Sequence, residues 1–74
     1  MKLPVLSGAN LVKCLTKEGY VVYHQTGSHL ILRLGKSPFT RITVPNHKVI
    51  APGTLLAIIR QAGISREQLY ELLE

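Results

Sequence analysis

The fold is decided by residues 20–34, which read YVVYHQTGSHLILRL. Residues 20–26 are rich in aromatic and β-branched side chains, which favour β-strands. Residues 29–34 alternate leucine with other types, as expected of a strand with one buried face. Gly27-Ser28 between them suits a two-residue turn, and a glycine in first place favours type II′. We therefore predict an antiparallel hairpin.

The two faces of this hairpin differ in chemistry. The inward positions of the second strand are Leu30, Leu32 and Leu34, and its outward positions are His29, Ile31 and Arg33. If Thr26 pairs with His29, His24 also lies outward, opposite Ile31. The register stays open at this point, because a bulge near Gly27 would exchange the faces of His24 and Gln25.

A third strand is predicted over residues 39–44, after a turn at residues 35–38. Its inward positions are Ile42 and Val44, and its outward positions are Arg41 and Thr43. Pro45 has no N–H to donate to a neighbouring strand, so we expect the strand to stop near it.

Helices are predicted on both sides of the strands. Ser7 suits the N-cap of a first helix over residues 8–18, and Gly19 suits the position after its end. A left-handed glycine there turns the chain back, so we expect Tyr20 to pack in the core. Cys14 falls on the apolar stripe of this helix and is expected to be a buried small hydrophobe.

Two more helices follow the third strand. Pro52 suits the start of one helix, and Gly63 suits its end. The stripe predicted to be buried is Leu55, Ile58, Ile59 and Ala62. Residues 65–68, SREQ, form a capping box for a short last helix. The order α-β-β-β-α predicts an α+β fold, one domain over residues 1–74, with the helices on one face of a three-stranded antiparallel sheet.

The charge is unevenly distributed. Nine Lys and Arg stand against four Glu in 74 residues, giving net +5. Three of the acids are Glu67, Glu71 and Glu74, so residues 1–66 hold nine cations and one acid, which leaves +8. Such a body favours a polyanionic partner, most often a nucleic acid.

The same composition excludes several classes of protein. Two-carboxylate glycosidases and two-metal nucleases need clustered acids, and no cluster precedes Glu67. One cysteine excludes an intrachain disulfide and a Cys-rich zinc site. The apolar runs are too short to span a bilayer, and residues 1–10 do not look like a signal peptide, so we expect a cytoplasmic protein.

The candidate proton-transfer groups are therefore histidines. His29 starts the second strand directly after the turn, on the outward face with Arg33 and Arg41. Its ordinary pKa of about 6.5 suits proton exchange near neutrality. His47 follows the third strand, and His24 precedes the turn. A three-histidine metal site is an alternative, although no motif with ligand spacing supports it. Ordinary surface roles are the other alternative.

Taken together, these features resemble the HicA toxin family, also called YcfA-like. The similar segments run from residue 7 to about residue 72. They are Ser7-Gly8, Gly19-Tyr20, residues 25–29 (QTGSH), residues 44–47 (VPNH), residues 53–55 (GTL) and residues 59–65 (IRQAGIS). Their order and spacing are more specific than any one of them. That family resembles the double-stranded RNA-binding domain in fold, in agreement with the predicted order of elements.

The resemblance implies a toxin of a type II toxin–antitoxin system that cleaves mRNA and is held inactive by a HicB-like antitoxin. His29 falls on the family's catalytic histidine, and His47 and His24 are candidates for a second proton-transfer group. The residues expected to bind RNA are Ser28, Arg33, Lys36, Arg41 and Lys48. We expect no metal and no cofactor. A homo-oligomer stays open.

Two other classes of function remain at this stage. A non-catalytic RNA-binding module of the same fold would use the same cations without needing His29. A protein-binding adaptor would dock its basic body on an acidic partner. Cleavage of RNA that depends on His29 separates the first reading from both alternatives.

Overall fold

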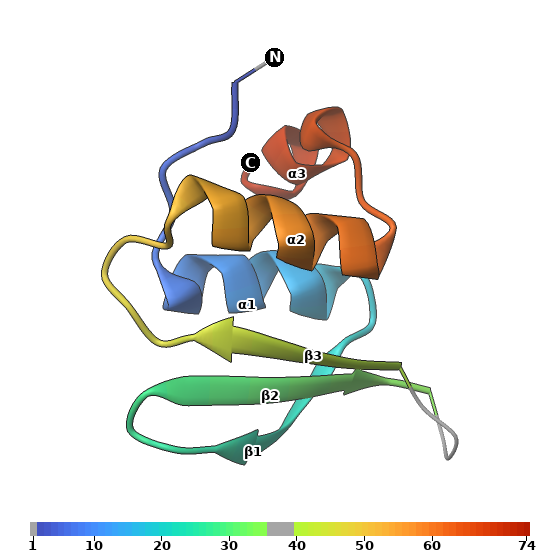
Figure 1. Cartoon of the computed structure of the whole chain (residues 1–74). Helices are drawn as coiled ribbons and strands as arrows, with labels where there is room; N and C mark the ends of the chain where they lie inside the picture. The colour runs from blue at the N-terminus through green and yellow to red at the C-terminus, as the bar shows by residue number, and fades with distance from the viewer. Residues whose placement is uncertain (1, 36–39) are drawn as a thin grey trace.

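A computed structural model describes residues 2–35 and 40–74. The elements in chain order are α1 (Gly8–Lys17), β1 (Val21–Gln25), β2 (His29–Leu34), β3 (Thr40–Pro45), α2 (Pro52–Ala62) and α3 (Arg66–Leu72). Helices α1 and α2 lie together over one side of the sheet, and α3 lies beyond them, on the side away from the strands (Figure 1). The predicted α-β-β-β-α order, with its extra C-terminal helix, is therefore confirmed.

The sheet is an antiparallel meander with the order β1-β2-β3. Leu30 and Leu32 of the central strand face the helices, being 8% and 0% exposed, and pair with Val44 and Ile42. Leu34 follows the same alternation but is 38% exposed, because it ends the strand at the margin of the helical layer. The inward leucine face is thus confirmed for its first two members.

The β1–β2 turn keeps the predicted register but not the predicted type. Thr26 N–H donates to His29 O at 2.9 Å, and the Thr26 hydroxyl accepts from the amides of Ser28 (3.3 Å) and His29 (3.0 Å). Gly27 does not have a positive φ, so type II′ is wrong. The hydroxyl of Thr26 takes the amide that its own carbonyl would otherwise accept, so the turn closes without a left-handed residue.

A bulge lies inside β1, farther from the turn than the alternative near Gly27. The pairing His24↔Ile31 is as predicted, and the register then shifts between Val22 and His24. The extra residue, Tyr23, places Val22 opposite Leu32 on the inward face. The bulge therefore lets both ends of β1 contribute as the sheet requires, with His24 outward and Val22 against the helices.

The third strand also matches its pattern. Ile42 and Val44 are fully buried, and Arg41 and Thr43 are exposed. Phe39, with which this strand was predicted to begin, lies outside the described residues, as does Lys36. Pro45 is the last residue of β3, as its missing N–H requires.

Local chemistry accounts for the ends of the helices. The Ser7 hydroxyl accepts from Asn10 N–H at 3.1 Å, which caps α1. Gly19 has φ +97°, and Tyr20 N–H donates to Leu15 O at 3.1 Å, so the chain turns back and Tyr20 is 4% exposed. Gly63 ends α2 in the same left-handed conformation. The capping box of α3 is present, with both of its hydrogen bonds.

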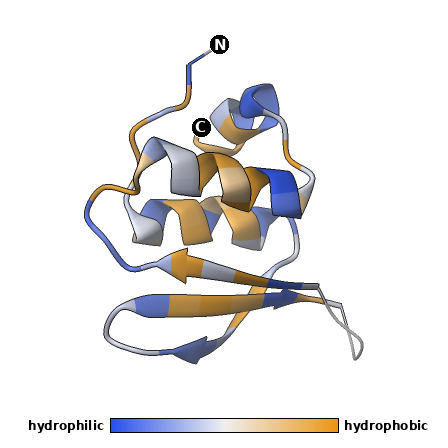
Figure 2. Cartoon of the chain, viewed as in Figure 1, coloured by the Kyte–Doolittle hydropathy of each residue, from blue (hydrophilic) through white to orange (hydrophobic). Residues whose placement is uncertain are grey.

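The core fills the space between the sheet and the three helices. Figure 2 shows hydrophobic residues where these layers meet. The members of the core that are almost completely buried are Leu11, Cys14, Leu15, Leu32, Ile42, Val44, Leu55, Ile59 and Leu69. Burial raises the pKa of the Cys14 thiol, which agrees with its predicted role as a buried hydrophobe. In the part of the chain that the structure describes, no helix has the length and apolarity needed to cross a bilayer.

Candidate active site

The β1–β2 turn, the end of β3 and the start of α1 are joined by backbone hydrogen bonds. Asn46 N–H donates to Ser28 O at 2.8 Å, and Gly8 N–H donates to His47 O at 2.9 Å. A β-carbon at Gly8 would overlap the carbonyl oxygen of Pro45, so only glycine allows this close approach. These contacts hold the residues after β3 against the turn that carries His29.

The result is one open hollow that contains two of the three histidines. It has a volume of about 360 Å³ and is lined by His29, Thr43, Pro45, His47, Ala51 and Thr54. His29 and Pro45 are paired across β2 and β3, which places the first residue of β2 beside the start of the following loop. Both histidines are exposed, so substrate and solvent can reach them.

His29 has a hydrogen-bonding partner for one of its ring nitrogens. The Ser28 hydroxyl oxygen lies 2.9 Å from His29 Nδ1. When Nδ1–H donates to this oxygen, the proton of the neutral ring is on Nδ1 and Nε2 is left as the base. Ser28 is exposed, and its carbonyl also accepts from Asn46. The hydroxyl predicted to bind RNA thus contacts the histidine instead.

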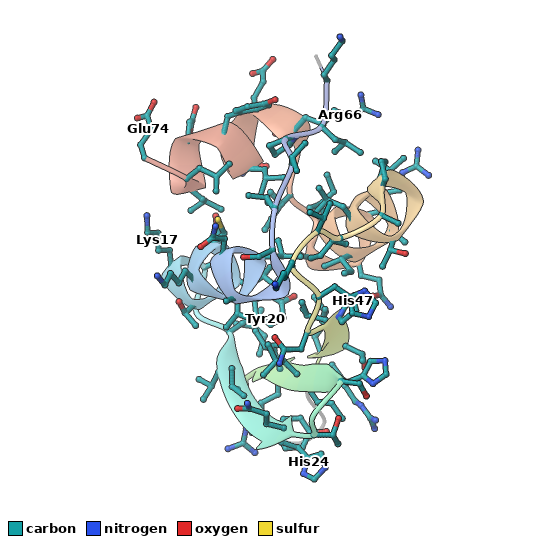
Figure 3. All side chains as sticks on the ribbon, turned by 90° about the vertical axis from the view of Figure 1, so that its left-hand side faces the viewer. Lys17, Tyr20, His24, His47, Arg66 and Glu74 are labelled. Carbon is teal, nitrogen blue, oxygen red and sulfur yellow. The ribbon has the colours of Figure 1, made fainter. Side chains whose placement is uncertain are left out.

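His24 does not belong to this hollow. It lies on β1, opposite Ile31, and does not line the cavity. Figure 3 shows His24 at the far end of the sheet from the loop that carries His47. Within residues 2–35 and 40–74 no three His, Cys, Asp or Glu side chains are grouped as metal ligands, so the three-histidine alternative has no support.

The predicted cations lie around the site rather than in it. Arg33 and Arg41 are paired across β2 and β3 on the outward face, and the Arg33 guanidinium lies 5.8 Å from the centre of the Tyr23 ring. Lys48 is exposed and directly follows His47. None of these three lines the hollow, among the residues whose placement is described.

The electrostatics of the hollow are positive without a cation inside it. Ala51 and Thr54 belong to the N-terminal end of α2, whose N-cap, Ala51, has no side chain to accept from the first amides. Free N–H groups and the helix dipole make such an end attractive to anions. None of the lining residues is an acid. A phosphate entering the hollow would therefore meet two imidazoles and a helix N-terminus.

Sequence reasoning missed this contribution of α2. The signal was available, because Ala51 precedes Pro52 where Ser, Thr, Asp or Asn would usually cap the helix. What the sequence alone does not give is the distance in space between residue 29 and residue 54. That distance depends on how α2 packs over β3.

Fold and site together define a small basic α+β protein with a hollow lined by histidines. A sequence model described as "HicA toxin of bacterial toxin-antitoxin" matches residues 8–64, which is more than half of the chain. The chain therefore belongs to the HicA toxin family and is a toxin of a toxin–antitoxin pair. The match runs from the start of α1 to residue 64 and includes Ser28, His29 and His47. No curated protein and no solved structure matched the chain.

Proposed function

We propose that this toxin is a metal-independent endoribonuclease that cleaves mRNA with His29 as its catalytic residue. The observation that carries the proposal is the meeting of His29 and His47 in one hollow that no acid lines, at the uncapped end of α2. Two imidazoles suffice for cleavage that uses the ribose 2′-hydroxyl, because one accepts a proton and the other supplies one.

The proposed reaction is a transesterification within the RNA. Neutral His29 takes the proton of a 2′-hydroxyl through Nε2, and the 2′-oxygen attacks the adjacent phosphorus. The bond from phosphorus to the 5′-oxygen breaks, and protonated His47 gives its proton to that oxygen. The products are a 2′,3′-cyclic phosphate and a 5′-hydroxyl, with one proton taken up and one released. DNA lacks the nucleophile and is not cleaved.

Negative charge grows on the phosphoryl oxygens during this step. The first amides of α2, beside Thr54, are suited to stabilise it, since they are fixed before the reaction and carry no competing side-chain cap. Arg33 and Arg41 lie four residues along the strands from the level of His29, about 13 Å away. We therefore assign Arg33, Arg41 and Lys48 to phosphates that flank the cleaved bond, and we keep Lys36 as a further candidate.

The cellular setting follows from the same proposal. A toxin that acts on mRNA works in the cytoplasm and inhibits translation there. A HicB-like antitoxin is its proposed partner. An inhibitor that covers the hollow would need to reach both the β1–β2 turn and the loop after β3, because each contributes one histidine.

The experiment compares RNA cleavage by wild type, His29→Ala and His24→Ala at equal concentration. We expect His29→Ala to lose about 10²- to 10⁴-fold in rate, the usual contribution of one proton-transfer group. His24→Ala is the matched control, since it removes an exposed histidine of the same hairpin that lies outside the hollow. Wild-type activity should persist in EDTA.

Two results would contradict the proposal. Full cleavage by His29→Ala would remove the catalytic assignment. Tight RNA binding by wild type without any cleavage would favour a non-catalytic RNA-binding module of this fold. Activity lost in EDTA and restored by a divalent cation would replace the metal-free route.

A further inference from the structure

A second hollow lies on the other side of the loop between β3 and α2. Its volume is about 400 Å³, and its apolar wall includes Leu3, Val5, Val49 and Pro52. Val5 is 80% exposed and Val49 is 58% exposed, which makes them the two most exposed large hydrophobic residues in the described parts of the chain. Two such side chains in one hollow form an apolar patch, and exposed apolar patches mark interaction sites.

The walls of this hollow are held in place by hydrogen bonds. Ile50 N–H donates to Leu6 O at 2.8 Å, which joins the loop before α2 to the N-terminal segment. The Tyr70 hydroxyl donates to Lys2 O at 2.9 Å, which joins that segment to α3. Leu6 and Ile50 are themselves buried. Figure 2 shows hydrophobic residues in both the segment and the loop. A preformed surface loses little entropy when a partner binds.

The charge around the hollow is of one sign. Lys2 and Arg66 line it together with the apolar residues, and no acidic side chain does so. An apolar centre with a cationic rim complements a segment that carries an apolar side chain beside carboxylates. The hollow is open to solvent and built from two chain segments, which suits a protein surface better than an enclosed small molecule.

We propose that this hollow, lined by Lys2, Val5, Val49 and Arg66, is the docking site of the antitoxin. An acidic segment of the antitoxin inserts an apolar side chain between Val5 and Val49 and places its carboxylates against the two cations. The inference rests on the antitoxin partner of the proposed function and not on RNA cleavage. Lys2, Val5 and Arg66 lie outside the residues that match the family, so this surface is suited to distinguish the partner of this toxin from other antitoxins.

The position of the hollow explains how docking would inhibit the toxin. Val49 and Pro52 line this hollow, and His47 and Ala51 line the candidate active site, so one short loop forms a wall of both. A partner anchored at Val49 lies beside the histidines. It also fixes the loop that positions His47.

The test places a photo-crosslinking residue at position 49 of the full chain and mixes it with the purified antitoxin of the same pair. Position 21 is the matched control, because Val21 is 56% exposed but lies on β1. We expect crosslinks from position 49 and not from position 21. The crosslinked antitoxin peptide should contain Asp or Glu beside an apolar residue.

Affinity measurements complete the test. Val49→Glu and Lys2→Glu should each weaken antitoxin binding about tenfold or more, as loss of an interface anchor does, whereas Val21→Glu should not. Thermal unfolding of each variant checks that its fold is intact. Lys2→Glu keeps the result interpretable if Val49→Glu unfolds, because the fold uses only the backbone carbonyl of Lys2.

Several outcomes would overturn the inference. They are wild-type affinity in both variants, crosslinking from position 21 alone, crosslinking to RNA, and crosslinking between two copies of the toxin. Failure of the unmodified chain to bind the antitoxin would remove the partner as well as the surface. Binding that depends on Val49 in a protein without ribonuclease activity would keep this inference and refute the proposed cleavage.

Discussion

At the scale of single residues, the chemistry of this protein depends on where two imidazoles are held. His29 has its Nδ1 beside the Ser28 hydroxyl at 2.9 Å, and His47 has its backbone carbonyl bound by Gly8. The first contact sets which nitrogen of His29 is the base, and the second fixes the loop. Neither histidine is buried, so both titrate in contact with solvent.

Removal of the Ser28 hydroxyl tests the first of these contacts. Ser28→Ala should lower kcat about tenfold with little change in KM, because one hydrogen bond of about 1 kcal/mol orients the ring without binding substrate. Ser28→Thr retains a hydroxyl and should recover most of the rate. The pH–rate profile should shift in the alanine variant and return in the threonine variant. An equal loss in both variants would show that Ser28 acts through something other than its hydroxyl.

At the scale of elements, the site exists because the start of α1 touches the end of β3. Gly8 has no room for a side chain against Pro45, whereas Gly53 in the first turn of α2 has nothing within 4 Å of a β-carbon. The two glycines are therefore a matched pair. One is required by a close approach of backbones, and the other is not.

Gly8→Ala should destabilise the protein by about 1–3 kcal/mol, the usual range for overpacking, and should reduce cleavage by displacing the loop that carries His47. Gly53→Ala should be neutral or slightly stabilising, since alanine is the better helix former. Urea unfolding and cleavage rates measured on both variants check this. Equal stability of the two variants would contradict the close packing of α1 on β3.

At the scale of the whole molecule, net charge brings the RNA and the outward face of the sheet orients it. Four acids against nine cations leave the protein at +5. Arg33 and Arg41 sit as a cross-strand pair on the outward face, remote from the acids of α3. Their role is expected to appear in the salt dependence of RNA binding rather than in the chemical step.

The double variant Arg33→Gln, Arg41→Gln should flatten the plot of log affinity against log salt by about 0.7 per lost phosphate contact on single-stranded RNA. Arg60→Gln on α2 removes one exposed cation away from the sheet and serves as the control. Fluorescence anisotropy over a range of salt concentrations gives the slopes. Unchanged slopes in the double variant would place the RNA on another face.

Much of the fold could be predicted because its signals are local. Ser7, Gly19, Gly63 and the Ser65–Gln68 box each determine a helix end through one or two nearby hydrogen bonds. The alternation in residues 29–34 fixed the buried face of β2. The turn type was wrong because it depends on the Thr26 hydroxyl, and the bulge at Tyr23 was missed because it depends on the packing of Val22.

The site was predictable only in part. His29 and His47 were named from the sequence, and the structure brings them to one hollow. His24 was named with them and lies elsewhere on the hairpin. The contribution of Ala51 and Thr54 was not foreseen, since it arises from tertiary packing of α2 beside β3 and not from any spacing along the chain.

The most direct test of the central claim is the chemistry of the RNA ends. A defined RNA is incubated with the toxin, and the fragments are identified by mass spectrometry, with His29→Ala in parallel. The account predicts 2′,3′-cyclic phosphate and 5′-hydroxyl ends from wild type and no fragments from His29→Ala. Fragments with 5′-phosphate ends, or cyclic phosphates at an undiminished rate from His29→Ala, would contradict it.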